Sequence, residues 1–271
     1  MLEEPIITLT TDFGLKDPFV GLMKGVILGI NPKARIIDIT HSVQRHNIYE
    51  ASQVLDMSYK FFPTTTLHIV VVDPGVGSNR RPIMVATDKY YFIGPDNGVF
   101  STIYEDAASG FMRVFHLTAS HYFLPMSGST FHGRDIFAPV AAYLSKGVGT
   151  DKFGEQIDDY HRISVPRPVK SGNSISGEII AIDSFGNAIT NIKREDITAH
   201  VSGDSAERCS IAFNNIETTM VHYYAEHQGS ELSAIINSFG NLELFVFQGS
   251  AADKFHIKIG DRMSVNLPDI Q

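Results

Sequence analysis

Residues 67–80 have the sequence LHIVVVDPGVGSNR, in which a hydrophobic run ends at Asp73 and a Pro-Gly turn leads on to Arg80. The run has the length and composition of a buried strand. A residue at the end of such a strand lies at the carboxyl edge of the sheet, which is where open α/β sheets bind their ligands. We therefore expect Asp73 to lie in a binding site, with Arg80 turned back toward it.

Strand-like and helix-like segments alternate on the amino-terminal side of this run. Runs rich in β-branched residues at 6–11 and 34–40 flank an apolar helical pattern at 18–30. A second helical pattern, at 48–62, precedes the strand-like run at 66–72. This alternation predicts a mainly parallel sheet.

The rest of the chain changes in character at two prolines within 165–168, which predict a linker. Before them, 81–98 is typical of a hairpin and 136–144 of a helix. After them come short strand-like runs at 174–182, 188–192, 207–213, 231–237, 242–247 and 262–267. Their spacing favours a small antiparallel barrel or sandwich. We predict an α/β domain over 1–165 and a small antiparallel β-barrel-like domain over 166–271.

The composition excludes several classes of protein. A hydrophobic fraction of 43% in 271 residues is ample for packed cores. The net charge of −8, without a basic block, disfavours nucleic acid as a partner. The single cysteine, Cys209, rules out an internal disulfide and a cysteine-based metal cage. Because no stretch is long and apolar enough to span a bilayer, we expect no membrane association and a cytoplasmic protein.

Asp12 ends the first strand-like run as Asp73 ends the third, so both carboxylates should lie along one edge of the sheet. A carboxylate at this edge can accept two hydrogen bonds from a vicinal diol such as a ribose. Asp12 alone fits equally well as the N-cap of a helix that starts near Asp17-Pro18. Its recurrence with Asp73 favours a binding site.

His132 lies in GSTFHGRD, residues 128–135, a loop of small residues that leads into a helix. Such a loop brings backbone N–H groups and a titratable side chain to one place. Most isolated histidines are structural, and the adjacent Arg134-Asp135 is more typical of a structural ion pair. An Asp, an Arg and a His brought together can nevertheless hold and polarise a water molecule, which predicts an enzyme.

Two other kinds of site compete with this interpretation. The G-x-G at 75–77 lacks the Lys-Ser/Thr of a triphosphate loop and the third glycine of a dinucleotide fingerprint, so we reject a phosphate loop. A divalent ion held by Asp12, Asp73 and His132 is the main chemical alternative. Arg80 disfavours it, because a guanidinium is electrostatically costly beside a metal ion and natural beside a carboxylate.

Two similar turns occur in the second predicted domain, DSFGN at 183–187 and NSFGN at 237–241. Each is by default a plain hairpin turn. Together they are also compatible with a pocket that stacks an aromatic heterocycle and hydrogen-bonds its edge.

Five motifs follow one another along the chain: TDFG at 11–14, DPGVG at 73–77, FHGRD at 131–135, DSFGN at 183–187 and NSxG at 237–240. In this order they resemble the S-adenosyl-L-methionine hydroxide adenosyltransferases, a family related to the bacterial fluorinase and chlorinase. The resemblance implies an α/β domain, a β-barrel-like domain and a homotrimer whose active sites lie between neighbouring subunits. It also implies that water displaces methionine from the 5′ carbon of S-adenosylmethionine (SAM) to give adenosine, without a metal or cofactor.

The resemblance further implies roles for individual residues. The family's catalytic Asp, Arg and His fall on Asp73, Arg80 and His132. The halogenating relatives have Tyr and Ser where this chain has His132 and Gly133, which places the chain with the hydrolytic branch. By the same resemblance, Asp12 contacts the ribose, and Phe131 and Tyr224 line the nucleoside pocket. Asn187, beside Phe185, contacts the adenine edge. Asp183 and Ser238 bind the methionine end, and Gly133 and Ala251 are further binding positions.

Two positions depart from the family's pattern. Gln248 stands where many relatives have an arginine, which removes a fixed positive charge for the methionine carboxylate. His46 stands where the fluorinase has a stacking tryptophan. Two other functions remain as alternatives, a halide-using SAM adenosyltransferase and a module that binds adenosine or SAM without turnover. The presence of all three catalytic residues disfavours the binding module.

Overall fold

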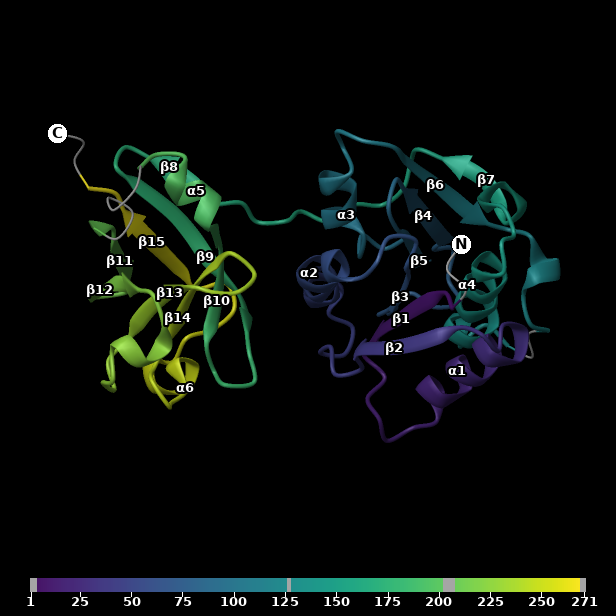
Figure 1. Ribbon diagram of the computed structural model, residues 1–271, viewed down its shortest axis with the longest axis horizontal. Helices are drawn as coiled ribbons and strands as arrows, with labels where there is room; N and C mark the ends of the chain where they lie inside the picture. The colour runs from purple at the N-terminus through teal and green to yellow at the C-terminus, as the bar shows by residue number, and fades with distance from the viewer. Residues whose placement is uncertain (1–3, 126–127, 202–207, 269–271) are drawn as a thin grey trace. The chain divides into compact units, whose positions relative to one another are not determined.

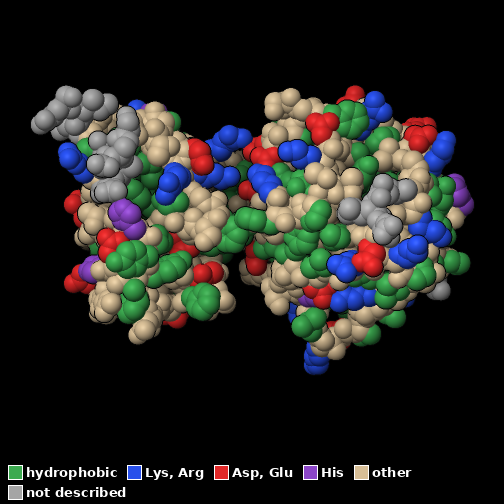
Figure 2. Space-filling view, viewed as in Figure 1, with side chains coloured by type: hydrophobic (Ala, Val, Ile, Leu, Met, Phe, Trp, Pro, Cys, Tyr) green, Lys and Arg blue, Asp and Glu red, His purple; other side chains and the backbone are tan. Residues whose placement is uncertain are grey.

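The computed structural model describes residues 4–125, 128–201 and 208–268. The chain divides into two compact units, Met1–Val165 and Pro166–Gln271. The first contains a seven-stranded sheet covered by helices, and the second contains a β-barrel (Figure 1). On the visible face of each unit, acidic and basic side chains are interspersed (Figure 2). Within the described ranges, every helix is too short or too polar to cross a membrane.

The sheet of the first unit has the strand order β2-β1-β3-β5-β4-β6-β7. Its strands are β1 (Ile6–Thr11), β2 (Arg35–Thr40), β3 (Leu67–Val71), β4 (Pro82–Thr87), β5 (Tyr91–Pro95), β6 (Met112–Leu117) and β7 (Gly154–Ile157). The first four strands in this order run parallel, and β4, β6 and β7 join the sheet through antiparallel pairings. The predicted hairpin at 81–98 is the β4–β5 pair.

Helices cover both faces of this sheet. They are α1 (Phe19–Ile30), α2 (Ile48–Ser58), α3 (Ser101–Asp106) and α4 (Ala138–Ser145), with the 3-10 turns η1 (Tyr59–Phe61), η2 (Ser120–Tyr122) and η4 (Thr150–Lys152). Leu67, Ile69 and Val71 pack with α1 and α4, whereas Val70 and Val72 pack with α2 and α3. Because β3 is buried on both faces, apolar residues occur at successive positions along it, and its one polar residue, His68, is buried with them.

The helix predicted at 136–144 begins three residues earlier than expected. A π-helical turn, η3 (Gly133–Phe137), precedes α4 and starts directly after His132. Pro139 has no N–H to donate to the carbonyl of Asp135, and Leu124 N donates to that carbonyl instead, at 2.9 Å. A wide turn of this kind is common at functional sites.

The second unit is a closed barrel. Its strands are β8 (Val169–Ser171), β9 (Ser174–Ile182), β10 (Ala188–Lys193), β11 (Ser210–Phe213), β12 (Ile216–Val221), β13 (Ser233–Ile236), β14 (Asn241–Phe245) and β15 (Arg262–Asn266), with α5 (Arg194–Thr198), η6 (Tyr224–Glu226) and α6 (Ala251–Phe255). The pairing of β9 with β10 closes seven strands into the barrel, and β8 pairs with β9 outside it.

The barrel confirms the predicted fold class with three differences. The prediction missed β8 and β12, and the pairing of β12 with β13 is parallel although the other pairings of the barrel are antiparallel. The strand predicted at 207–213 begins at Ser210, and residue 207 lies outside the described part of the chain.

Candidate active site

Two carboxylates leave the sheet of the first unit at neighbouring strand ends. Thr11 is the register partner of Val71 in the parallel β1–β3 pair. Asp12 directly follows Thr11, and Asp73 lies two residues beyond Val71. Both therefore lie at the carboxyl edge of the sheet, as the sequence predicts.

The turn that follows Asp73 packs against the loop that carries His132. Gly77 has a φ of +79°, and a Cβ atom at this position would lie 2.7 Å from the carbonyl oxygen of Ser129. Only glycine allows both this backbone conformation and this close approach. The glycine therefore lets the turn after Asp73 pack directly against the loop that carries His132.

Asp73, Arg80 and His132 form one hydrogen-bonded group. Arg80 Nε lies 2.9 Å from both carboxylate oxygens of Asp73, and Arg80 Nη2 contacts Asp73 Oδ2. The same Nη2 donates to His132 Nδ1 at 2.9 Å. The side chains of Asp73 and Arg80 are only 5% and 9% exposed, and the guanidinium lies 5.5 Å from the ring centroid of Phe137. Burial makes this ion pair specific in geometry and strongly dependent on both partners.

The protonation state of His132 follows from its neighbours. Burial lowers the pKa of His132, and the positive charge of Arg80 lowers it further, against opposing effects of Asp73 and Asp135. His132 is therefore neutral at neutral pH. Because arginine can only donate hydrogen bonds, Nδ1 accepts from Arg80 and we assign the ring proton to Nε2.

Asp12 does not cap a helix, so the N-cap alternative is wrong. The residue before α1 is Pro18, without a side-chain cap, and Asp12 Oδ2 instead accepts a hydrogen bond from His46 N at 2.9 Å. His46 itself is exposed and has a φ of +67°. Asp12 therefore fixes the loop between β2 and α2.

A chain of polar contacts supports the segment that carries Asp12. Thr11 Oγ1 lies 2.9 Å from His41 Nδ1, and His41 Nε2 lies 3.0 Å from Asp38 Oδ1. Lys24 donates to Asp38 Oδ2 at 2.6 Å. Burial opposes the ionisation of Asp38, but the hydrogen bonds from Lys24 and His41 outweigh it and lower the pKa of Asp38. These contacts hold the end of β1 in place.

The divalent-ion alternative finds no support in this geometry. Both oxygens of Asp73 accept hydrogen bonds from Arg80 and are directed at the guanidinium. Within residues 4–125, 128–201 and 208–268, no three His, Cys, Asp or Glu side chains are grouped so that they could hold a metal ion.

Phe131 and Gly133 flank His132 in the sequence and lie close to each other. The ring of Phe131 packs edge-on against Phe13 and Phe19, with centroids 5.8 and 5.3 Å away. Arg134 Nε donates to the buried Asp135 at 2.6 Å, which confirms the predicted structural ion pair. Arg134 also lies over the Phe131 ring, at 5.2 Å. The ion pair thus holds the ring from its outer side.

In the second unit, the turn at 183–187 is ordered by its own aspartate. Asp183 Oδ1 accepts from the backbone N of Phe185 and Asn187, and Asp183 Oδ2 accepts from Asn187 Nδ2 at 3.1 Å. Gly186 has a φ of +82° and packs against Ser250, which precedes Ala251 at the start of α6. Asp183, Asn187 and Ala251 are thereby brought together, and the Phe185 ring is 77% exposed.

The second turn, 237–241, lies at the other end of β10. Ala188 is the register partner of Leu244, whereas Lys193 pairs with Asn241. The register thus separates the two turns along β10, and a pocket lined by both stays a prediction. Ser238 is exposed on this second turn.

Tyr224 is linked to the second turn by Glu243, a residue that the sequence prediction missed. Tyr224 donates from its hydroxyl to Glu243 Oε1 at 2.8 Å, and Asn237 Nδ2 donates to Glu243 Oε2 at 3.0 Å. The signal that could have identified Glu243 is a lone charge inside the apolar run 242–246. Gln248 is exposed and has a φ of +53°.

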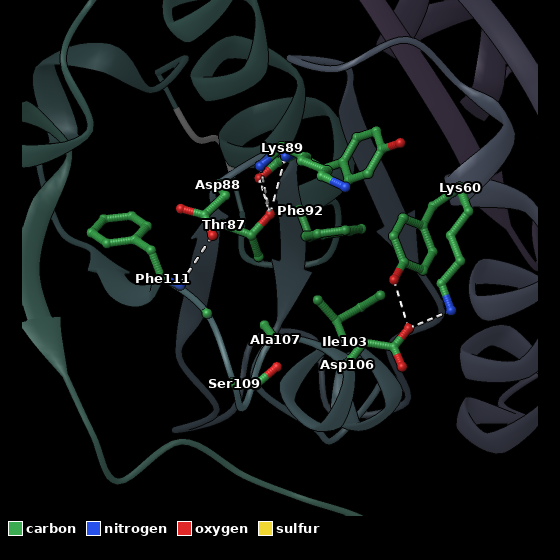
Figure 3. Close-up of a pocket in the computed structure, with 13 residues that line it drawn as sticks. Lys60, Thr87, Asp88, Lys89, Phe92, Ile103, Asp106, Ala107, Ser109 and Phe111 are labelled. Carbon is green, nitrogen blue, oxygen red and sulfur yellow. Dashed lines mark hydrogen bonds and ion pairs between the residues drawn. The ribbon is translucent and has the colours of Figure 1, made fainter.

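The first unit also contains a cavity of about 590 Å³, drawn in Figure 3. It is lined by the β4–β5 turn, η1 and the end of α3. Because β5 runs parallel to β3, its first residue, Tyr91, marks the amino-terminal edge of the sheet, opposite Asp73. Asp106 in this cavity already accepts hydrogen bonds from Tyr59 and Lys60. We therefore assign the candidate active site to the other edge.

Comparison with known proteins connects both units to one family. Residues 7–154 match the SAM hydroxide adenosyltransferase N-terminal domain, and residues 177–264 match its C-terminal domain. A protein of Methanocaldococcus jannaschii named (R)-S-adenosyl-L-methionine hydrolase is 36% identical, over 96% of this chain and 95% of its own length. A protein of Salinispora tropica with the same name is 32% identical, over 98% and 99%.

More distant and structural relatives agree. A fluorinase of an Actinoplanes species is 27% identical over 71% of this chain and 73% of its own length. The crystal structure of an uncharacterized conserved protein from Thermotoga maritima superposes with a TM-score of 0.87 at 34% identity, covering 96% of this chain and 99% of that one. Both domain matches and the full-length similarity lead to one conclusion: this chain belongs to the SAM hydroxide adenosyltransferase family.

Proposed function

We propose that this protein hydrolyses S-adenosyl-L-methionine to adenosine and L-methionine, and that Asp73, Arg80 and His132 activate the attacking water. The observation that carries the proposal is the buried Asp73–Arg80–His132 group at the carboxyl edge of the sheet. The names of the full-length relatives support the substrate and the reaction.

The leaving group needs no general acid, because the sulfonium sulfur departs as the neutral thioether of methionine. The enzyme has to align the water with the 5′ carbon and remove its proton. In our proposal His132 Nε2–H donates to the water oxygen and orients it. The oxygen bonds to the 5′ carbon as the carbon–sulfur bond breaks, the electron pair passes to sulfur, and the water proton passes to a lone pair of Asp73 that Arg80 does not use.

We propose that residues from both units hold the substrate, without a metal or other cofactor. In this proposal Asp12 contacts the ribose, and Asn187 and Phe185 contact the adenine edge. Asp183 and Ser238 bind the methionine end. The remaining contacts to the nucleoside come from Phe131, Gly133, Tyr224 and Ala251. Gln248 supplies no fixed positive charge for the methionine carboxylate, so we expect weaker binding of that group than an arginine would give.

The central experiment incubates the purified protein with SAM, with and without a chelator, and follows adenosine by chromatography. We expect adenosine at the same rate in both samples. No adenosine after long incubation would contradict the proposed function, and loss of turnover with the chelator would revive a metal site. Parallel samples with chloride and fluoride test the halide-using alternative, which predicts 5′-haloadenosine in place of adenosine.

Two conservative variants separate the roles of the proposed acid–base groups. Asp73→Asn cannot accept the water proton, so turnover should fall by roughly 10²–10⁴-fold while adenosine binding changes little. His132→Gln keeps a side-chain N–H donor and should retain more turnover than His132→Ala. Equal activity of the two His132 variants would show that orienting the water by a donor is not the role of His132.

We also propose a homotrimer in which each active site combines one subunit's first unit with its neighbour's second unit. Exposed apolar side chains on both units, including Leu15 at 78% and Phe185 at 77%, support further association. Light scattering on the eluted protein tests this, because a fully active monomer would contradict a shared site. We propose a cytoplasmic location, where the buried thiol of Cys209 stays reduced.

A further inference from the structure

Glu243 is a buried charged residue on a strand of the barrel. Its neighbours Leu242 and Leu244 belong to the barrel core. Successive side chains of a strand point to opposite faces, so Glu243 and Phe245 share the outer face of β14. Glu243 is nevertheless only 3% exposed, because Tyr224 and Asn237 cover it.

The two donors to Glu243 come from two different parts of the second unit. Tyr224, from η6, donates to Oε1 at 2.8 Å, and its ring packs edge-on against Phe245 at 4.9 Å. Asn237 Nδ2 donates to Oε2 at 3.0 Å. The orientation of the Asn237 amide is fixed, because its Oδ1 accepts from the backbone N of Phe239 and Asn241.

We propose that Glu243 is a positioning residue for substrate binding, which holds the Tyr224 ring and the 237–241 turn in the places where SAM meets them. This role rests on the proposed function, in which Tyr224 contacts the nucleoside and Ser238 the methionine end. Tyr224 is 44% exposed on a 3-10 turn of only three residues, so without this hydrogen bond its ring would be free to leave the site. Pre-ordering a side chain lowers the entropy lost on binding.

The electrostatics explain why the contact needs both donors. Burial raises the pKa of Glu243, and the nearby negative charge of Asp183 raises it further. The hydrogen bonds from Asn237 and Tyr224 act in the opposite direction and stabilise the carboxylate. Asn237 can only donate through Nδ2, whereas a tyrosine hydroxyl can donate or accept.

This difference between the donors defines a matched pair of variants. In Glu243→Gln the amide oxygen can accept from Asn237 while the amide N–H donates to the Tyr224 hydroxyl, so both contacts survive without the charge. Glu243→Met fills a similar volume and loses both contacts. The measurements are KM and kcat for SAM, the Kd for adenosine by calorimetry, and the melting temperature of each variant.

We expect Glu243→Met to raise KM and the adenosine Kd by roughly tenfold, with kcat within about twofold of the wild type. Glu243→Gln should stay within about threefold of the wild type in all three. An unchanged KM in Glu243→Met, or an equal loss in Glu243→Gln, would overturn the proposal. If Glu243→Met fails to fold, Tyr224→Phe, which keeps the carboxylate and the ring, should raise KM with kcat nearly unchanged; an unchanged KM there would overturn it as well.

The wild-type protein separates this inference from the proposed function. If the wild type releases no adenosine from SAM, the proposed function is wrong. If it turns over SAM normally and the Glu243 variants match its KM, only the role of Glu243 is wrong.

Discussion

Replacement of Arg80 by leucine tests the central ion pair of the site. Leucine fills part of the volume of the guanidinium but leaves Asp73, a side chain only 5% exposed, without its charge partner. Removing one member of a buried ion pair costs about 3–5 kcal/mol. We expect the free energy of unfolding to fall by about that amount, and turnover to fall by roughly 10²–10⁴-fold because the water-activating group loses its alignment.

The same variant should move the pH profile of any residual activity. Arg80 lowers the pKa of His132, and Asp73 and Asp135 raise it, so loss of Arg80 raises the pKa. A positively charged imidazolium would withdraw electron density from the water that Nε2–H holds and make it a poorer nucleophile, so the acidic limb of the profile should shift to higher pH.

The assays are urea unfolding and adenosine formation across pH, and the control is the double variant Asp73→Asn/Arg80→Leu. The double variant removes the unpaired buried charge, so it should recover part of the lost stability but none of the turnover. If Arg80→Leu unfolds at the wild-type urea concentration and keeps the wild-type pH profile, the reasoning about the buried pair is refuted.

Two further predictions concern other residues of the first unit. Burial lowers the pKa of His68 to about 3 from a usual value of 6.5. Between these two pH values only the unfolded chain gains a proton on this residue. The free energy of unfolding should therefore fall as the pH decreases through this window, by up to about 1.4 kcal/mol per pH unit. His68→Phe should flatten this dependence in thermal unfolding, and an unchanged slope would contradict the assignment. A Cβ at Gly133 would lie 3.1 Å from Met23 Sδ and 3.2 Å from the Phe131 ring, so Gly133→Ser and Gly133→Ala should raise the KM for SAM alike. Haloadenosine formed by the serine variant alone would instead show that this position selects the nucleophile.

The fold and the site differ in how much of each the sequence could predict. The run at 67–72 is buried on both faces, so apolar residues follow one another on both sides of the strand, His68 apart, and the strand is evident. β12 was missed because its burial alternates between half-buried and exposed positions, without a fully buried residue. At the early start of the helix after His132, Leu124 N replaces the missing donor of Pro139 at the Asp135 carbonyl, and this contact exists only in the folded chain.

Among the site residues, too, some could be predicted from the local sequence and others could not. Asp12, Asp73 and His132 lie beside turns and small-residue loops, which have recognisable sequences. Glu243 was missed because its importance depends on Tyr224, which lies 19 residues away and meets it only after the barrel closes. Local sequence identifies a strand end, whereas a contact between two separate elements depends on the register of the sheet.

The guanidinium of Arg80 has one nitrogen, Nη1, that takes no part in the ion pair with Asp73. Its Nη1 is buried and has no hydrogen-bond partner among the described residues. Removing such a donor from water costs about 1–3 kcal/mol, and folding alone has already incurred that cost. An oxygen atom reaches Nη1 only when the packing around it shifts, and it then meets a donor that needs no further dehydration. We expect the binding enthalpy of an oxygen-bearing ligand to be more favourable here than at a solvated arginine, because the new hydrogen bond satisfies a donor that the free protein leaves without a partner.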